Sequence, residues 1–285
     1  MTRRPLNLLL GAALLALGPW VQAACLTDAQ VDAMLNDIDA RTPAANPQGL
    51  SAEDGMCSRA KLIARLTARH GAPVGYKAGL TNPGVQQRFK ASEPVWGALY
   101  WPMLLAEGIP VEAAFAARPL FEADLLVRVS SAAVNQAKTP VEVLAAIDQV
   151  IPFIELPDLV VRAPGELDGA AIAAINVGAK LGVVGTPIAV QRTPAFADAL
   201  RDMTVVLKVD GTEADRGRGS DVLGHPLQAV VWLAQALARE GRALKPGDLV
   251  SLGSFSKLLP PKPGLKVSVE YQGLPGTPDV AVIFR

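Results

Sequence analysis

The chain has 285 residues, of which 50% are hydrophobic and 19% charged, and its formal net charge is zero. This length allows one large or two modest domains with a sizeable core, and the balanced charge argues against a nucleic-acid-binding surface or a disordered tail. The 25 glycines and 23 prolines are spread along the chain and favour a strand-rich body with many turns over a helical bundle.

The first 24 residues have the layout of a cleaved secretory signal peptide. Two arginines precede an apolar stretch over residues 6–21, and a small-residue site follows at Val21-Gln22-Ala23-Ala24. A retained membrane anchor fits less well, because the apolar stretch is short and interrupted by glycine. We therefore expect export, in a bacterium to the periplasm, with no membrane association once the signal is removed.

The two cysteines, Cys25 and Cys57, both lie near the start of the mature chain. An oxidising compartment would let them form a disulfide that ties the new N-terminus to the second predicted helix. In an alternative interpretation Cys25 is a lipidated first residue, because Ala23-Ala24-Cys25 resembles the end of a lipobox. Gln22 stands where such a motif prefers leucine, so we favour the disulfide.

Residues 25–73 are predicted to form a helical N-terminal region. A capping box at Thr27 begins one helix, and Ser51 caps a second helix that ends at Gly71. The pattern then changes to short apolar runs between glycines and prolines. Residues 74–285 are therefore predicted to form one β-rich domain.

A single lysine, Lys77, lies in a predicted strand over residues 74–81. Its side chain can simply extend to the surface. Beside a group of carboxylates it can instead act as an acid or base, or hold an acidic substrate. A turn at residues 82–84 and a short helix over 85–90 follow, and a loop over 93–97 then enters another strand.

Two acids interrupt the apolar, β-prone segment over residues 121–127. Glu122 and Asp124 are two residues apart, so on a strand their side chains leave from the same face, while Phe121, Ala123 and Leu125 face a core. Neighbouring carboxylates repel each other and lose solvation unless a positive charge lies between them. Alternatively, these acids line the solvated face of an antiparallel sheet or pair with a nearby arginine, Arg118 or Arg128.

A third acid, Glu155, lies in the predicted strand over residues 151–156, after a helix predicted from Thr139 to Val150. This strand–helix–strand spacing can bring Glu155 beside Glu122. Carboxylate oxygens without histidine or cysteine suit a hard cation such as Mg²⁺, Mn²⁺ or Ca²⁺.

The remainder of the chain is predicted to contain further strands and one long helix. The glycine-rich segment over residues 216–221 lacks the G-x-x-x-x-G-K spacing of a phosphate-binding loop. His225-Pro226 begins a helix that runs to Glu240. The predicted strands cover residues 181–185, 203–209, 249–253, 267–271 and 280–284, with a hairpin turn at residues 210–211.

Taken in order, these segments resemble the hydratase/decarboxylase branch of the fumarylacetoacetate hydrolase superfamily. The resemblance extends from about residue 51 to residue 284. It is carried by Gly75-Tyr76-Lys77-Ala78-Gly79-Leu80-Thr81, Glu93-Pro94-Val95-Trp96-Gly97, residues 119–124, Pro152-Phe153-Ile154-Glu155, Gly217-Arg218-Gly219-Ser220, Leu223-Gly224-His225-Pro226 and residues 245–253.

The resemblance implies an α+β fold, a mixed β-roll with a helical N-terminal extension, in which three carboxylates hold Mg²⁺ or Mn²⁺. By position these are Glu122, Asp124 and Glu155, with an aspartate at 124 where relatives usually carry a second glutamate. Lys77 matches the family's acid/base lysine. The implied activity is that of a hydro-lyase, the hydration of a small unsaturated 2-oxo acid such as 2-keto-4-pentenoate in the breakdown of aromatic compounds. We also expect a homo-oligomer.

The chain departs from the family pattern at several positions. Val95 stands where relatives carry an aspartate that takes part in proton transfer, so hydration would rely on Lys77, Glu93 or metal-bound water. Ile175-Asn176-Val177-Gly178 replaces the usual Asp-Asn-Ala-Ser. Asn176 and Ser254 are predicted to contact the substrate.

These departures leave other functions open on the same scaffold. Decarboxylation of a vinylogous 2-oxo acid runs through the same type of dienolate as hydration. Hydrolysis of a carbon–carbon bond, as in acylpyruvate-cleaving relatives, is a third possibility. A non-catalytic periplasmic protein that binds a 2-oxo acid is the alternative outside enzymes.

Overall fold

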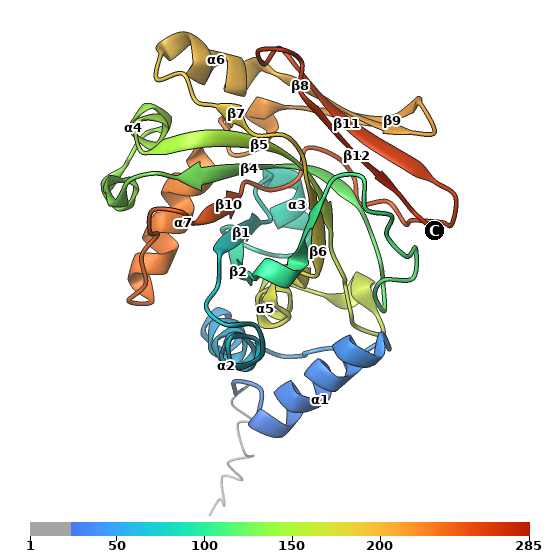
Figure 1. The fold of residues 1–285 in the computed structure, drawn as a ribbon. Helices are drawn as coiled ribbons and strands as arrows, with labels where there is room; N and C mark the ends of the chain where they lie inside the picture. Colours follow the sequence, from blue (N-terminus) through green and yellow to red (C-terminus); the bar gives the residue numbers. More distant parts are fainter. Residues whose placement is uncertain (1–23) are drawn as a thin grey trace, which may run out of the picture.

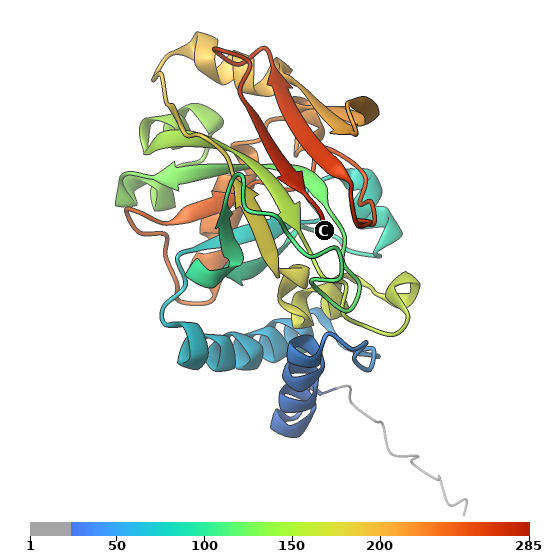
Figure 2. The ribbon, with the colours of Figure 1, turned by 45° about the vertical axis from the view of Figure 1, so that its right-hand side comes forward.

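The computed structural model describes residues 24–285, in which a helical pair, a large curled sheet and a smaller sheet follow one another through space. Figure 1 and Figure 2 show the helical pair at one end of the molecule and the smaller sheet at the other. The predicted signal peptide falls almost entirely on residues outside the described part. No helix within residues 24–285 is long and apolar enough to cross a membrane.

The helical pair consists of α1 (Asp28–Ala40) and α2 (Ala52–His70), and both helices begin with a capping box, of which the one at Thr27 was predicted as such and the one at Ser51 only as a cap. The Thr27 hydroxyl accepts from the Gln30 N–H, and the Ser51 hydroxyl accepts from the Asp54 N–H at 3.1 Å. Each cap satisfies backbone donors that the first helical turn leaves free.

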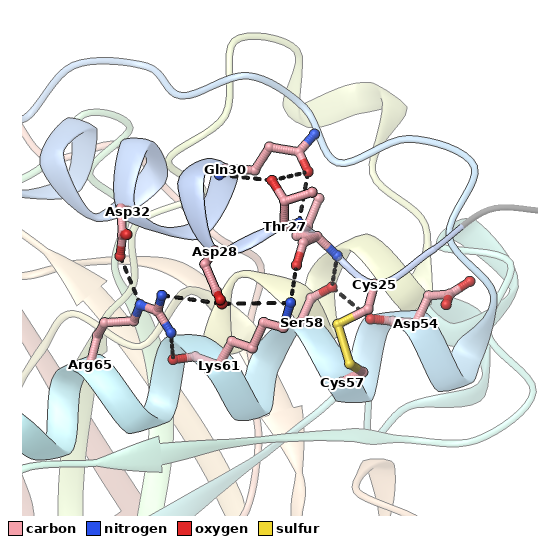
Figure 3. A network of polar contacts seen from close by, with 11 residues as sticks. Cys25, Thr27, Asp28, Gln30, Asp32, Asp54, Cys57, Ser58, Lys61 and Arg65 are labelled. Carbon is pink, nitrogen blue, oxygen red and sulfur yellow. Dashed lines mark hydrogen bonds and ion pairs between the residues drawn. A yellow bond between two sulfur atoms is a disulfide. The ribbon is translucent and has the colours of Figure 1, made fainter.

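A disulfide joins Cys25 to Cys57, with 5.6 Å between the Cα atoms, and confirms the predicted pairing. It uses the Cys25 sulfur that a lipid anchor would need. Figure 3 shows the polar contacts beside it, in which Arg65 of α2 reaches Asp28 at 3.2 Å and Asp32 at 2.7 Å on α1. The disulfide attaches the segment before α1 to α2, and the ion pairs attach α1 itself to α2.

The large sheet has eight strands in a mixed arrangement and curls around a core (Figure 1). Its path is β2-β1-β10-β4-β5-β6-β3, and β7 pairs with β5. The strands are β1 (Gly75–Gly79), β2 (Val95–Leu99), β3 (Leu104–Ala106), β4 (Glu122–Val129), β5 (Ile147–Leu156), β6 (Leu181–Val184), β7 (Ile188–Ala189) and β10 (Leu249–Ser251).

The smaller sheet is antiparallel, in the order β12-β11-β8-β9, and packs against β4, β5 and β6. Tyr271 of β11 is fully buried and its hydroxyl lies within hydrogen-bond distance of the backbone oxygens of Asp124 and Phe153. The same hydroxyl accepts from the Phe153 N–H at 3.1 Å. The strands are β8 (Thr204–Val209), β9 (Thr212–Arg218), β11 (Lys266–Gln272) and β12 (Asp279–Ile283).

Short helices fill the connections between strands. The apolar face of α7 packs against β1 and α4, and α5 packs against α2 and β2. The helices are α3 (Pro83–Arg88), α4 (Pro140–Ala145), α5 (Gly169–Ala174), α6 (Pro194–Asp202) and α7 (Gln228–Arg239), and single 3₁₀ turns include η2 (Ala132–Gln136) and η4 (Asn176–Gly178).

The helix predicted from Thr139 to Val150 is wrong over its second half. Helix α4 ends at Ala145, and the chain enters β5 two residues later. Ile147 and Val150 pair with Val129 and Val127 of β4, and all four side chains are buried. Strand pairing with burial of these β-branched residues overrides the local helical pattern.

Other differences from the sequence-based elements are smaller. Helix α6 and strands β3 and β7 were not predicted, and residues 216–218 of the glycine-rich segment belong to β9. The fold class is confirmed, an α+β fold with a curled mixed sheet and a helical N-terminal extension. The division of the chain at residue 74 remains a prediction.

Removing the disulfide is expected to lower stability, because the bond closes a loop between residues 32 positions apart. The double variant Cys25→Ala/Cys57→Ala should lose roughly 2–4 kcal/mol of unfolding free energy, measured by chemical denaturation. Reductant should produce a similar loss in the unmodified chain and no further loss in the variant. An unfolding midpoint that reductant leaves unchanged would contradict this.

Candidate active site

Strand register places four charged side chains on one face of the large sheet. Glu122 of β4 lies directly opposite Glu155 of β5, and Asp124 leaves β4 from the same face two residues later. Lys77 of β1 lies opposite Ser251 of β10, which in turn lies opposite Leu126 of β4. Since opposite residues share a face, Lys77 faces the same side as the three acids.

All four side chains are buried, with exposed fractions of 4% for Lys77, 9% for Glu122, 0% for Asp124 and 2% for Glu155. We call these four residues the acid–lysine cluster. Phe121, just before β4, and Ala123 and Leu125 on its other face lie in the main hydrophobic core, as predicted, and Val127 lies there too.

An ion pair between Lys77 and Glu155 is the central contact of the acid–lysine cluster. The Lys77 ammonium also donates to the backbone oxygen of Val177 at 3.0 Å. The second carboxylate oxygen of Glu155 is buried and has no hydrogen-bond partner. A buried anionic oxygen without a partner is costly, so this atom is the point in the cluster that most needs a positive charge or a donor.

Asp124 is held by three donors. Its carboxylate accepts from the Gly253 N–H at 3.0 Å, from the N–H of the next residue, Leu125, at 2.5 Å, and from the Ser251 hydroxyl. These contacts fix the orientation of the side chain toward β10. The serine at position 251 was not predicted as a site residue, although a polar residue within the apolar run at residues 249–252 was a usable signal.

The three acids outnumber the positive charge available to them. Burial, and then repulsion from Glu155, raises the pKa of Glu122 well above its ordinary value. The same two causes raise the pKa of Asp124 to about 7. Burial favours the neutral amine of Lys77, but Glu155 and Glu122 outweigh it and raise the lysine pKa. The three acids are therefore not all ionised at neutral pH, because together they would carry more negative charge than one ammonium group can balance.

The donor chemistry of the acid–lysine cluster suits a hard divalent cation, but its geometry is that of an ion pair. Within residues 24–285, no three Asp, Glu, His or Cys side chains converge as a set of metal ligands. The surplus of carboxyl groups over ammonium groups and the unpartnered Glu155 oxygen both fit a cation bound by carboxylates.

Ser254, one of the two residues predicted to contact substrate, lies at the edge of the acid–lysine cluster. Its contact with Glu122 opposes the upward shift of the Glu122 pKa. The same hydroxyl lies 2.6 Å from the backbone oxygen of Ser256, so its single proton can be donated to either acceptor. Ser254 is half-buried, so it lies between the cluster and the surface.

The side chain of Asn176, the other predicted substrate contact, is hydrogen-bonded to the backbone of strand β2. Its amide accepts from the Ala98 N–H at 2.7 Å and donates to the Ala98 oxygen at 3.0 Å, and the residue is 2% exposed. Both polar atoms of the amide are thus bonded to Ala98, and contact between Asn176 and a substrate remains a prediction.

The surroundings of Lys77 on β2 are apolar. Gly97 lies opposite Lys77, and Val95 lies opposite Gly79 on the same face. Glu93, the acid nearest in sequence to Val95, accepts from the Trp232 indole at 3.1 Å and from Arg239 at 3.0 Å. Its carboxylate is engaged by helix α7 and is largely exposed. Glu93 is therefore an unsuitable proton carrier for Lys77.

Comparisons with known proteins agree with this arrangement of elements. The family model described as fumarylacetoacetate (FAA) hydrolase C-terminal matches residues 104–277, which include the three acids. A 2-keto-4-pentenoate hydratase of Paraburkholderia xenovorans (strain LB400) is 32% identical over 192 residues, covering 67% of this chain and 69% of that enzyme. A 4-oxalocrotonate decarboxylase of Pseudomonas sp. (strain CF600) is 30% identical over 211 residues, covering 74% and 78%.

A solved structure shares the fold over almost the whole chain. It is the 4-oxalocrotonate decarboxylase from Pseudomonas putida G7 complexed with magnesium and adipate. The TM-score is 0.80 at 24% identity, and the match covers 92% of this chain and 100% of that one. At this identity the likeness establishes the fold alone.

Replacing Asp124 with asparagine tests the charge excess. Because the pKa of Asp124 is raised to about 7, the folded state holds this proton more tightly than the unfolded chain does. The carboxyl group therefore stabilises the fold at low pH and loses this contribution as pH rises toward 7. Relative to the unmodified chain, Asp124→Asn should gain about 1–3 kcal/mol between pH 4.5 and pH 8, measured by denaturation in EDTA.

Asp148→Asn is the matched control for this experiment. The hydrogen bond from Arg128 lowers the pKa of Asp148, so its contribution to stability changes mainly below about pH 4, and the relative stability of this variant should stay nearly constant between pH 4.5 and pH 8. A relative stability of Asp124→Asn that stays flat or falls with pH would contradict the charge excess.

Proposed function

The chain belongs to the fumarylacetoacetate hydrolase family, and we propose that it is an exported lyase that depends on a divalent cation and acts on a small unsaturated 2-oxo acid. The observation that carries the proposal is the acid–lysine cluster, in which three buried carboxylates share one ammonium group. Hydration of a substrate such as 2-keto-4-pentenoate is the first candidate, in keeping with the related hydratase.

Glu122, Asp124 and Glu155 would hold the cation, with Mg²⁺ or Mn²⁺ as the proposed ions. Their oxygens are the hard ligands that these ions prefer. When bound, the ion supplies a Lewis acid that stabilises negative charge developing on the oxygens of the 2-oxo acid. The 4-oxalocrotonate decarboxylase of similar fold was solved with magnesium, which supports the choice of a divalent ion.

Lys77 is the proposed proton carrier. Its ammonium is buried, and its hydrogen bond to the Val177 oxygen and its ion pair with Glu155 hold it in one position. A buried lysine in a fixed position can deliver a proton to a substrate carbon and take one back. Ser254, at the edge of the acid–lysine cluster, is the proposed substrate contact.

Decarboxylation is the second candidate, and the apolar surroundings of Lys77 favour it. Hydration needs a proton added to one carbon and another removed from water, whereas decarboxylation releases carbon dioxide and needs at most one proton delivered to carbon. Val95 and Gly97 provide no titratable group beside Lys77 on β2. A site with one proton carrier is therefore better suited to decarboxylation, which needs fewer proton transfers than hydration.

Export is proposed from the predicted signal peptide and the Cys25–Cys57 disulfide, because such bonds persist in oxidising compartments. The substrate, a small acid, is the proposed partner, and a homo-oligomer is the proposed assembly.

The proposed activity is tested with the purified chain, Mg²⁺ or Mn²⁺, and two substrates. Loss of dienol absorbance from 2-hydroxypenta-2,4-dienoate reports hydration, and release of carbon dioxide from 4-oxalocrotonate reports decarboxylation. Lys77→Met and Glu155→Gln should each lower kcat at least about 100-fold. Binding of these acids without turnover would support the binding-protein alternative instead. The absence of both binding and turnover would refute the proposed substrate class.

Restoring an acid at position 95 should shift the balance between the two reactions. Val95→Asp should raise the hydration rate relative to decarboxylation by about tenfold or more, because a second proton carrier is added beside Lys77. Val95→Asn has the same shape without the carboxyl group and is the control. Equal effects of the two variants would show that proton transfer at this position is irrelevant.

A further inference from the structure

Three consecutive residues after α5 adopt left-handed backbone conformations, with φ of 54° at Asn176, 55° at Val177 and 65° at Gly178. Glycine and asparagine tolerate this region, whereas a β-branched residue such as valine is strained there. Strained residues persist only where the surrounding structure imposes the conformation, and they concentrate at functional sites. The contacts that impose this conformation therefore call for an explanation.

Asn176 provides one of these contacts by completing the edge of the large sheet. Strand β2 is at the end of the sheet path, and Asn176 pairs with both the N–H and the C=O of Ala98. A further strand would satisfy the same two groups. Gly97 permits the close approach, because a Cβ atom at this position would overlap the backbone oxygen of Asn176.

Val177 connects the same segment to the acid–lysine cluster. Its backbone oxygen accepts from the Lys77 ammonium at 3.0 Å, and its side chain fills the space above Gly79, two residues along β1. Among the described residues, the acceptors of Lys77 are therefore Glu155 and the Val177 oxygen. The Val177 oxygen is the neutral one, so it directs the ammonium without changing the charge of the cluster.

We propose that Asn176 is a positioning residue for Lys77. Its amide clamps the strained turn to β2, and the clamped turn aims the Val177 oxygen at the Lys77 ammonium. This inference deepens the proposed function, since it rests on Lys77 being the proton carrier. A purely structural Asn176 would stabilise the edge of β2 and leave Lys77 unaffected.

The chain contains a matched control for this distinction. Asn135 makes the same pair of bonds to a distant backbone unit, donating to the Leu244 oxygen at 2.8 Å and accepting from the Leu244 N–H at 2.9 Å. Its partner lies in the segment after α7, away from the acceptors of Lys77. The loss of such a clamp can thus be compared with and without a link to the lysine.

The experiment compares Asn176→Ala with Asn135→Ala in the full chain. The rate at which trinitrobenzenesulfonate modifies Lys77 is measured by peptide mass spectrometry, and kcat and KM are measured with the substrate that the unmodified chain turns over. In Asn176→Ala, Lys77 should be modified at least about tenfold faster than in the unmodified chain. The reason is that a lysine that is no longer held by the Val177 oxygen is exposed to the reagent more often. Its kcat should fall at least about tenfold while KM stays within about threefold.

Asn135→Ala should change both the rate of Lys77 modification and kcat by less than about twofold, even if its melting temperature falls by as much as that of Asn176→Ala. Asn176→Asp, which tolerates the left-handed backbone and keeps the acceptor for the Ala98 N–H, should lie between the unmodified chain and Asn176→Ala. It also serves if the alanine variant does not fold.

Equal Lys77 modification rates in the unmodified chain and the folded Asn176 variants would overturn the inference. So would a rate increase of the same size in Asn135→Ala. If the unmodified chain turns over no 2-oxo acid, the proposed function fails, and the modification rates still decide whether Asn176 holds Lys77.

Discussion

Three carboxylates buried against one ammonium group are the constraint on which the rest of the structure depends. Removing one partner of a buried ion pair typically costs about 3–5 kcal/mol, because the other charge is left unpaired. The Lys77–Glu155 pair therefore requires β1 and β5 to hold their positions, although β10 and β4 lie between them in the sheet. The donors from Ser251 and Gly253 serve the same end by fixing Asp124 toward β10.

The smaller sheet contributes to this constraint through Tyr271. Its hydroxyl contacts backbone groups of Asp124 on β4 and Phe153 on β5, at the place where the two strands carry the acids. A shift of β4 by one residue would turn Glu122 and Asp124 into the core and Ala123 and Leu125 toward Lys77. The Tyr271 hydroxyl thus stabilises the register in which the acids of β4 lie on the same face of the sheet as Lys77.

The sequence predicts the acidic face well and its surroundings poorly, for physical reasons. The two-residue spacing of Glu122 and Asp124 is enough to assign a common face, since side-chain alternation is a local property of strands. The extent of α4 is not local, because pairing with β4 decides where residues 147–150 go. Asn176 and Glu93 were candidates by residue type, and only the fold shows that Ala98 and α7 occupy their polar atoms.

The strand order also bears on the timing of folding. Strand β10 comes from residues 249–251, yet it lies between β1, near residue 77, and β4, near residue 124. The antiparallel β4–β5 pair can form from neighbouring parts of the chain, whereas β1 joins it only through a strand made much later. Such long-range closure slows folding. We therefore expect the acids to come together before their lysine joins them, and the site to be completed only when nearly the entire polypeptide has been synthesised.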